Sequence, residues 1–358
     1  MSRVRPLPVA ALAAAGSLLW TVTAQAAHKP RAHVPTPTPA PAPATPSPIA
    51  SAAPGRLQLV TQRVLGSSAF VLAGGRFVVQ GVVWPYVGGQ QVKVSLYRDG
   101  RKVAVKRLAV VAVGNGSGAF RFAYASSRAG VVQARVVHYA TPLQAQFTAR
   151  TQRIHFVAPN LRGGLRGGSV RVLQSELNAL HYVVPLNGVF DEATGRAVVA
   201  YRKVAGLEPV TSTNTHFFAL LGRGAGSFHV RYGGDGRHVE ADLTRQVLAE
   251  INPGGRVRAI YTMSSGKPST PTVVGRFRVY SKTPGTNAKG MVDSNYFIAG
   301  YAIHGYAEVP TYAASHGCLR VPIPNAASIY GWVALGTPVD VYHEGGGGSH
   351  HVNRRAGP

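Results

Sequence analysis

Glycine and proline constrain this chain more than any other feature of its sequence. The 358 residues include 42 glycines and 25 prolines, which excludes a fold that is helical throughout. Hydrophobic residues nevertheless make up 45% of the sequence and charged residues only 14%, which is too apolar for a wholly disordered protein. At roughly 100 to 200 residues per domain, we expect two or three β-rich or mixed domains joined by linkers.

The N-terminus predicts the compartment. Arg3 and Arg5 precede an apolar run over residues 9–20, and a small-x-small cleavage pattern follows at residues 24–26. We interpret residues 1–26 as a signal peptide. The alternative is an uncleaved membrane anchor, because the apolar stretch is nearly long enough to span a bilayer. In either case we expect an exported protein that acts in the cell envelope or the extracellular space.

A proline-rich segment follows the signal peptide. Residues 27–55 contain nine prolines among Ala, Thr and Ser, a composition that favours extended polyproline II over a packed core. We interpret this segment as a linker. A mucin-like glycosylated stalk is the alternative for a Pro/Thr sequence.

Residues 56–150 alternate between apolar and polar side chains. The alternation is clearest over residues 92–96, 120–124 and 131–137, and residues 98–101 predict a tight turn. Short strands at roughly ten-residue spacing, with turns between them, indicate a small β-sandwich. The segment resembles bacterial immunoglobulin-like modules, and we interpret it as an Ig-like spacer or scaffold. Binding of a partner through its surface charges is the alternative.

Residues 160–222 change to helical spacing. Ser169 is a predicted N-cap, and apolar residues recur at helical intervals from Val170 to Leu180. Asp191 opens a second helical run. These features predict a small helical module.

The same residues resemble a known family, the peptidoglycan-binding repeat of cell-wall hydrolases and transpeptidases. That family is a three-helix module with a wall-docking groove, and the matching segments here are residues 168–174, 177–180 and 187–194. The resemblance places a third helix within residues 214–221. Arg202 and Lys203 depart from the family, which usually has an aromatic–Gln pair at these positions.

The chain contains one cysteine, Cys318, which excludes a disulfide framework, a multi-cysteine zinc site and a cysteine-ligated iron–sulfur cluster. A thiol with a pKa of about 8.5 needs a neighbouring base or cation to act as a nucleophile at neutral pH. His304 and His316 are the candidate bases. Gly305 and Gly317 leave room for substrate, and the backbone N–H groups of Cys318 and the residues before it are candidates for an oxyanion hole.

These residues form a pattern that resembles the signature of the L,D-transpeptidase (YkuD-like) catalytic domain: His304-Gly305, followed by Ser315-His316-Gly317-Cys318-x-Arg320. Upstream, the resemblance extends to the family's S-T-G and T-P-x-G-x-F segments, here residues 263–267 and 270–277, with one extra residue before Gly275. Residues 297–305 resemble the strand that delivers the histidine. The resemblance covers residues 227–342.

The resemblance implies a β-rich domain and a reaction on peptidoglycan stem peptides. In that reaction a thiolate attacks the carbonyl of the third residue of a tetrapeptide stem, releases terminal D-Ala, and passes the acyl group to an amine. The resemblance implies neither a cofactor nor a metal. It also implies inhibition by carbapenems.

The resemblance assigns a role to each site residue. Cys318 is the nucleophile, His304 is the general base, and the carbonyl of Gly305 orients the imidazole. The remaining residues support the loop or meet the substrate: Ser315, His316 and Gly317 shape the loop and oxyanion hole, and Arg320, Tyr296 and Tyr301 contact the substrate. The two tyrosines have core packing as an equal alternative, because they lie in an alternating strand.

Three other functions compete with the transpeptidase. The same acyl-enzyme meeting water makes an L,D-carboxypeptidase, and no residue of the motif distinguishes the two acceptors. A non-catalytic wall-binding protein is an alternative from another class, against which the intact pair of His304 and Cys318 argues. A zinc amidase lacks support, because no HExxH or similar carboxylate-bearing cluster accompanies the histidines.

The formal net charge is +25. The basic residues are dispersed and no nucleic-acid-binding motif is present, so we do not expect a nucleic-acid partner. Attraction to anionic envelope polymers fits an exported basic protein better. We expect the glycine- and histidine-containing tail over residues 343–358 to be disordered. The predicted fold class is therefore mainly β and multidomain, with an Ig-like β-sandwich, a small three-helix wall-binding module and a β-rich L,D-transpeptidase catalytic domain.

Overall fold

The computed structural model describes residues 52–344. The predicted signal peptide, nearly all of the proline-rich linker and all but the first two residues of the predicted tail lie outside the described residues. None of the described helices is both long and apolar enough to cross a membrane.

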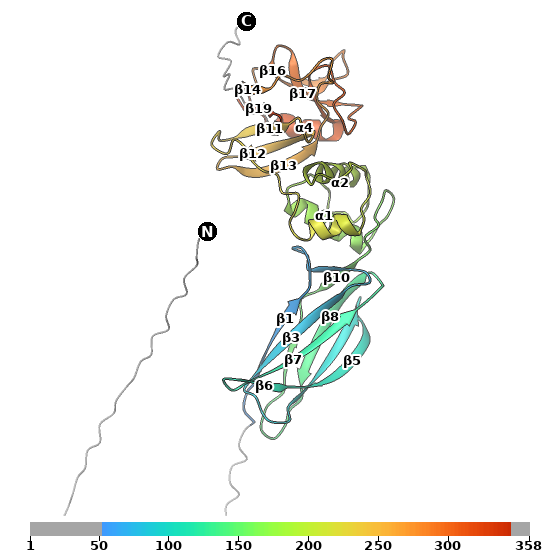
Figure 1. The fold of residues 1–358 in the computed structure, drawn as a ribbon, viewed down its shortest axis with the longest axis vertical. Coiled ribbons are helices and arrows are strands. Elements are labelled where there is room, and N and C mark those ends of the chain that lie inside the picture. Colours follow the sequence, from blue (N-terminus) through green and yellow to red (C-terminus); the bar gives the residue numbers. More distant parts are fainter. Residues whose placement is uncertain (1–51, 345–358) are drawn as a thin grey trace, which may run out of the picture. The chain divides into compact units, whose positions relative to one another are not determined.

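The first module is a sandwich of two mostly antiparallel sheets, as predicted (Figure 1). Its four-stranded sheet has the order β1-β3-β7-β6, with β1 at Arg56–Gln62, β3 at Arg76–Trp84, β7 at Ser117–Ala125 and β6 at Val111–Gly114. Its six-stranded sheet contains β2 (Phe70–Leu72), β10 (Ile154–Val157), β8 (Gly130–His138), β4 (Gln91–Arg98), β5 (Arg101–Ala109) and β9 (Phe147–Arg150). Buried side chains of both sheets form one core, including Phe77, Phe122, Val94 and Val132.

The sandwich continues beyond residue 150, the predicted end of this domain. Strand β10 pairs with both β2 and β8 in the six-stranded sheet. Its apolar residues Ile154 and Phe156 belong to the sandwich core. Strand β10 has only four residues, too few to show a clear alternation of apolar and polar side chains, so the sequence did not predict it.

The turn predicted at residues 98–101 joins β4 and β5. Arg98 pairs with Arg101, and the two residues between them, Asp99 and Gly100, have φ of 46° and 82°. Positive φ at both central residues matches the right-handed twist of the flanking strands, and Asp-Gly tolerates it well. The local sequence therefore determines this hairpin.

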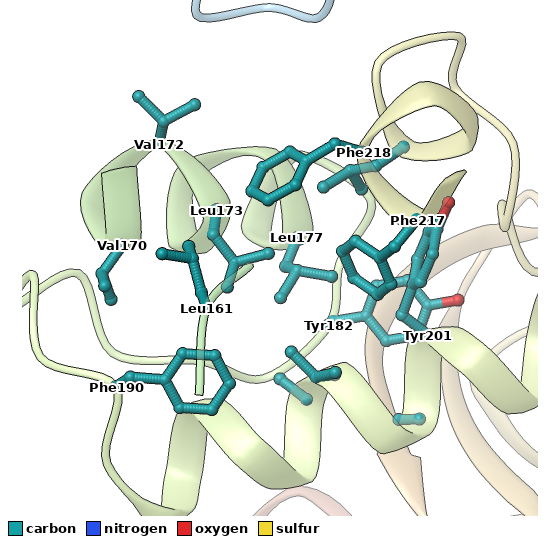
Figure 2. Packing of buried hydrophobic residues seen from close by; sticks show 14 of the residues in the cluster. Leu161, Val170, Val172, Leu173, Leu177, Tyr182, Phe190, Tyr201, Phe217 and Phe218 are labelled. Atoms are coloured by element: carbon teal, nitrogen blue, oxygen red, sulfur yellow. The ribbon is translucent and has the colours of Figure 1, made fainter. Parts of the chain in front are cut away.

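The helical module contains three helices around one apolar core, as predicted: α1 (Gly168–Ala179), α2 (Glu192–Val204) and α3 (Thr215–Leu221). Figure 2 shows the core side chains between the helices, among them Leu173, Leu177, Phe190 and Tyr201.

The helix starts confirm the predicted beginning of α2 at Asp191 and correct the predicted cap of α1. The carboxylate of Asp191 accepts a hydrogen bond from the N–H of Thr194 at 2.8 Å, as an N-cap does. Ser169 is not an N-cap, because α1 begins one residue earlier and its first turn has no side-chain cap. The Ser169 hydroxyl instead accepts from the N–H of Ala158 at 3.0 Å, which joins the helix to the preceding chain.

The third module has two sheets and one helix. The five-stranded sheet has the order β13-β12-β11-β19-β14, with β13 at Arg256–Thr262, β12 at Val247–Asn252, β11 at His238–Asp242, β19 at Pro338–Tyr342 and β14 at Gly275–Arg278. The four-stranded sheet has the order β15-β16-β17-β18, with β15 at Ser281–Thr286, β16 at Val292–Ile298, β17 at Tyr301–Tyr306 and β18 at Leu319–Pro322. Both sheets and helix α4 (Ile323–Trp332) share one core, including Val239, Phe277, Ile303 and Ile329.

Lys203 joins the helical module to the third module. Its ammonium group is buried and donates to the carbonyls of Gln246 and Met263, both at 3.0 Å, and to the hydroxyl of Thr262 at 2.8 Å. Burial lowers the pKa of Lys203 to about 7. The departure from the aromatic–Gln pair of the resembled family therefore has a structural purpose here, since the lysine holds α2 against the ends of β12 and β13.

Candidate active site

The pairing of β17 with β18 brings the candidate nucleophile and base together. The two strands are parallel, with Ile303 opposite Leu319 and His304 opposite Arg320. Continuing this register back by one residue places Cys318 opposite Ala302. Paired residues share a face of a sheet and faces alternate along a strand, so Cys318 lies on the same face as His304, one step along it.

The opposite face of these strands is core, which fixes the register. Ile303, Leu319 and Val321 all belong to the buried cluster of the third module. A shift of one residue would move these apolar side chains out of the core and the site residues into it. The hydrophobic pattern of the two strands therefore keeps Cys318 and His304 on the same face of the sheet.

His304 is buried and its orientation is fixed by one hydrogen bond. Its Nδ1 lies 2.9 Å from the carbonyl oxygen of Gly305, and because a carbonyl only accepts, Nδ1 carries the proton. The other ring nitrogen, Nε2, then has a free lone pair when the ring is neutral. Burial lowers the pKa of His304 below its ordinary value, the Gly305 carbonyl opposes this shift, and the charge of Arg320 adds to it. The imidazole of His304 is therefore neutral at pH 7.

The Cys318 thiol is only partly exposed and its pKa is raised by that burial. Three groups oppose the shift: a hydrogen bond with the backbone of Ala302 and the positive charges of Arg320 and Lys289. The resting thiol and imidazole are consequently both uncharged near neutrality. This arrangement suits proton transfer at the moment of attack better than a preformed ion pair.

Two hydroxyl groups hold the cysteine loop in place. Ser315 donates to the carbonyl of Cys318 at 2.6 Å and accepts from the N–H of Gly317 at 3.1 Å. Thr272 donates to the carbonyl of Gly317 at 2.8 Å and accepts from the N–H of Gly266 at 2.9 Å. The loop backbone is thus fixed from both sides.

The bond from Gly317 to Ser315 changes the predicted oxyanion hole. An N–H that already donates to a hydroxyl is not free for a developing oxyanion. Gly317 therefore has a conformational role, since its φ of +117° favours glycine and it lies against the ring of Tyr301. The N–H groups of Cys318 and His316 remain as candidates for the oxyanion hole.

The residues predicted to contact substrate occupy different faces. Tyr296 in β16 lies opposite Ala302, which places it on the face that carries His304. Tyr301 packs against the core cluster, and its ring also lies against Gly317 of the cysteine loop. His316 is exposed.

Arg320 is half-buried beside the histidine. Its guanidinium carbon lies 4.1 Å from the ring centroid of Tyr306, and that ring in turn meets His304 edge-on, with centroids 5.7 Å apart. Tyr306 thus contacts both Arg320 and His304. Its position two residues after His304 puts it on the same strand face.

Sequence reasoning missed three residues of this site. Thr272 lies in the segment 270–277 that resembles the family, but the resemblance assigned it no role. Tyr306 follows His304 by two residues in β17. Lys289 lies in the connection between β15 and β16. The alternation of a strand was a usable signal for Tyr306. Lys289 had no signal, because a single exposed lysine is common in a basic chain.

The comparisons with known proteins agree with this geometry. The family model of the L,D-transpeptidase catalytic domain (YkuD) matches residues 236–341, and that of a putative peptidoglycan-binding domain matches residues 166–211. The crystal structure of the L,D-transpeptidase from Xylanimonas cellulosilytica is 33% identical over 52% of this chain and 98% of that one, with a TM-score of 0.48. The chain belongs to the L,D-transpeptidase family.

Two further solved structures match about a third of this chain. An enzyme solved as its avibactam carbamoyl adduct is 30% identical over 32% of this chain and 49% of that one, with a TM-score of 0.28. A cysteine-to-serine variant of the Enterococcus faecium L,D-transpeptidase is 29% identical over 30% and 50%, with a TM-score of 0.27. No curated protein matches the chain.

Among residues 52–344, no group of three or more His, Cys, Asp or Glu side chains is arranged to bind a metal ion.

Titration of the thiol tests the electrostatics of the site. Because burial raises the pKa of Cys318, we expect its labelling by iodoacetamide to rise with pH through a midpoint above that of an ordinary cysteine, about 8.5. Arg320→Gln should move the midpoint higher still, since the positive charge favours thiolate. Labelling rates over a pH series measure both shifts. A midpoint below the ordinary value would contradict the burial argument.

The conformation of Gly317 gives a stability prediction. A Cβ at this position would lie 2.4 Å from Cε1 of Tyr301, on a backbone that L-residues rarely adopt. We expect Gly317→Ala to lower the free energy of unfolding by about 1–3 kcal/mol, measured by thermal or denaturant unfolding. Gly331→Ala is the matched control, because Gly331 lies in α4 with no atom near its added Cβ and should gain up to about 1 kcal/mol. Equal stabilities of the two variants would refute the argument.

Proposed function

We propose that this protein is a peptidoglycan L,D-transpeptidase that forms a cysteine acyl-enzyme with a tetrapeptide stem and transfers the acyl group to an amine. The observation that supports this most is the parallel register of β17 and β18, which places Cys318 and His304 on one face. The proposal includes action on the cell wall, outside the cytoplasm, since that is where the stem peptides lie.

Acylation begins with a proton transfer. Nε2 of His304 takes the thiol proton as Sγ of Cys318 attacks the carbonyl of the third stem residue. The Gly305 carbonyl, bonded to Nδ1, holds the ring in this tautomer and stabilises the imidazolium that forms. The backbone N–H groups of Cys318 and His316 are the proposed donors to the oxyanion.

Collapse of the tetrahedral intermediate releases D-Ala. The imidazolium returns the proton to the leaving amine, which breaks the C–N bond and leaves a thioester on Cys318. His304, again neutral, deprotonates the incoming side-chain amine of a second stem. Attack of that amine on the thioester forms the new amide and restores the thiol.

The positive charges near Cys318 are proposed to orient the substrate. Arg320 and Lys289 are the cations that act on Cys318, and both suit the terminal carboxylate of a donor stem. Arg320 is the better anchor, because its guanidinium is held over Tyr306 and can form paired hydrogen bonds. Tyr296 is proposed to line the same face.

The helical module is proposed to bind peptidoglycan. Its match to the peptidoglycan-binding domain and its complete three-helix core support this role.

The avibactam adduct of a relative supports a second proposal, that β-lactam-type acylating agents, carbapenems included, react with Cys318.

Incubation of purified muropeptides with the enzyme, followed by mass spectrometry, tests the proposal. A cross-linked dimer that has lost one D-Ala, formed by the wild type and not by Cys318→Ala, is the expected product. Loss of D-Ala without a dimer would assign water as the acceptor and make the protein an L,D-carboxypeptidase. No change in the muropeptides would leave the non-catalytic wall-binding function.

A further inference from the structure

The Ig-like sandwich carries a charge imbalance that the transpeptidase function does not use. Residues 56–157 contain fourteen Lys and Arg but a single acidic residue, Asp99. The carboxylate of Asp99 is engaged at the β4–β5 turn, where it accepts from the N–H of Val131 at 2.9 Å. Among the described residues, no basic side chain of this module forms a salt bridge.

Three of these arginines surround one hollow on the outer face of the four-stranded sheet. The hollow has a volume of about 320 Å³ and is lined by Arg63, Arg76 and Arg121 together with Val78, Phe122 and Ala123. Its size lies in the range of about 300–1,000 Å³ that is typical of ligand sites.

The strand register explains how the hollow is built. Val78 in β3 lies opposite Ala123 in β7, and these two small side chains form the floor. Arg76 precedes Val78 by two residues and Arg121 precedes Ala123 by two, so in antiparallel strands the arginines lie on opposite sides of the floor. Arg63 follows the end of β1 and completes the third side.

The side chains of the three arginines have no described partner. All three are exposed, and no hydrogen bond or salt bridge involves their guanidinium groups within residues 52–344. Three like charges around one hollow repel one another unless an anion lies between them. Guanidinium groups favour anions that accept paired hydrogen bonds, such as phosphate.

The spacing favours a polymer over a single ion. Arg76 and Arg121 are offset by four residues along their strands, which is about 13 Å at roughly 3.3 Å per residue. A chain with phosphate groups at intervals contacts both arginines along this length and also fills the hollow between them.

From these observations we propose that the hollow bounded by Arg63, Arg76 and Arg121 binds a phosphate-bearing anionic polymer. The site is separate from the catalytic face, and this proposal does not depend on the proposed function. It assigns to the sandwich a role in attaching the enzyme to its surroundings, beyond that of a spacer.

Binding of inorganic polyphosphate to the full-length protein tests the site. The test variant carries Arg63→Gln, Arg76→Gln and Arg121→Gln. The matched control carries Arg101→Gln, Lys102→Gln and Lys106→Gln, which remove the same charge from exposed positions of β5. Circular dichroism of both variants checks that the sandwich stays folded.

We expect the hollow variant to lose at least about tenfold in affinity by calorimetry, and its dependence on salt to weaken. The control should lose less than about threefold, the effect of net charge alone. Equal losses in the two variants, or no binding of polyphosphate by the wild type, would overturn the site. Polyglutamate of the same charge should bind more weakly, and equal binding of it at the hollow would overturn the preference for phosphate.

Discussion

We expect Cys318→Ala to abolish turnover of peptidoglycan stems while the protein stays folded. The chain has no second thiol to replace the nucleophile, and removal of a catalytic nucleophile costs on the order of 10⁴-fold or more. The side chain is only partly buried, so its shortening leaves a small cavity at most. Muropeptide analysis of the variant measures the loss.

The control for this variant is its fold. An unchanged circular dichroism spectrum, together with unchanged melting, separates loss of the nucleophile from unfolding. The hydroxyl of Ser315 bonds to the backbone carbonyl of Cys318 and not to the thiol, so the loop keeps its anchor in the variant. Turnover retained by folded Cys318→Ala would eliminate the cysteine mechanism.

His304→Ala should be nearly as damaging, with a loss of roughly 10²- to 10⁴-fold in kcat/KM. The variant removes both the base that takes the thiol proton and the acid that protonates the leaving amine. His316→Ala is the matched control, because His316 is an exposed histidine of the same loop and should leave measurable activity. A more severe effect of His316→Ala would mean that the base has been assigned to the wrong histidine.

The pH profile adds a second test of His304. Only the neutral imidazole accepts the thiol proton, and burial lowers its pKa below the ordinary value of 6.5. Activity of the wild type should therefore persist as the pH falls to 6.5 and decline below it. Arg320→Gln removes a positive charge that lowers this pKa, so the acid limb of the variant should move to higher pH.

Much of the scaffold was predictable because local signals and tertiary packing agree. The Asp-Gly turn of β4–β5 and the Asp191 cap of α2 are both read from neighbouring residues. The prediction of Ser169 as an N-cap was wrong, because its hydroxyl accepts a hydrogen bond from the N–H of Ala158, eleven positions earlier. The helical pattern of the sequence contains no signal for this contact. The prediction failed where a tertiary hydrogen bond replaced a local one.

The strand predicted over residues 297–305 shows the same limit. It is broken into β16 and β17 by a turn at Ala299 and Gly300, with φ of 39° and 81°. Alanine seldom adopts positive φ, so the sequence carries only half of the turn signal. The break matters for the site, because it makes β16 and β17 a hairpin and places Tyr296 opposite Ala302.

The sequence could predict which residues form the candidate site, but not the hydrogen bonds that hold the cysteine loop. Cys318, His304 and Gly305 follow from the motif, and the hydrogen bond between the histidine and Gly305 agrees with the role expected of that carbonyl. The engagement of the Gly317 N–H by Ser315, and of its carbonyl by Thr272, depends on how two distant segments meet. Only the fold brings those segments together.

Intact-protein mass spectrometry with a carbapenem tests whether Cys318 is a nucleophile in an assembled acyl-transfer site. We expect one covalent adduct per protein, mapped to the peptide containing residues 315–320, absent from Cys318→Ala and slower to form in His304→Ala. Absence of the adduct, under conditions in which iodoacetamide still labels Cys318, would contradict the account, because the thiol would then be accessible without the machinery that makes it an acyl acceptor.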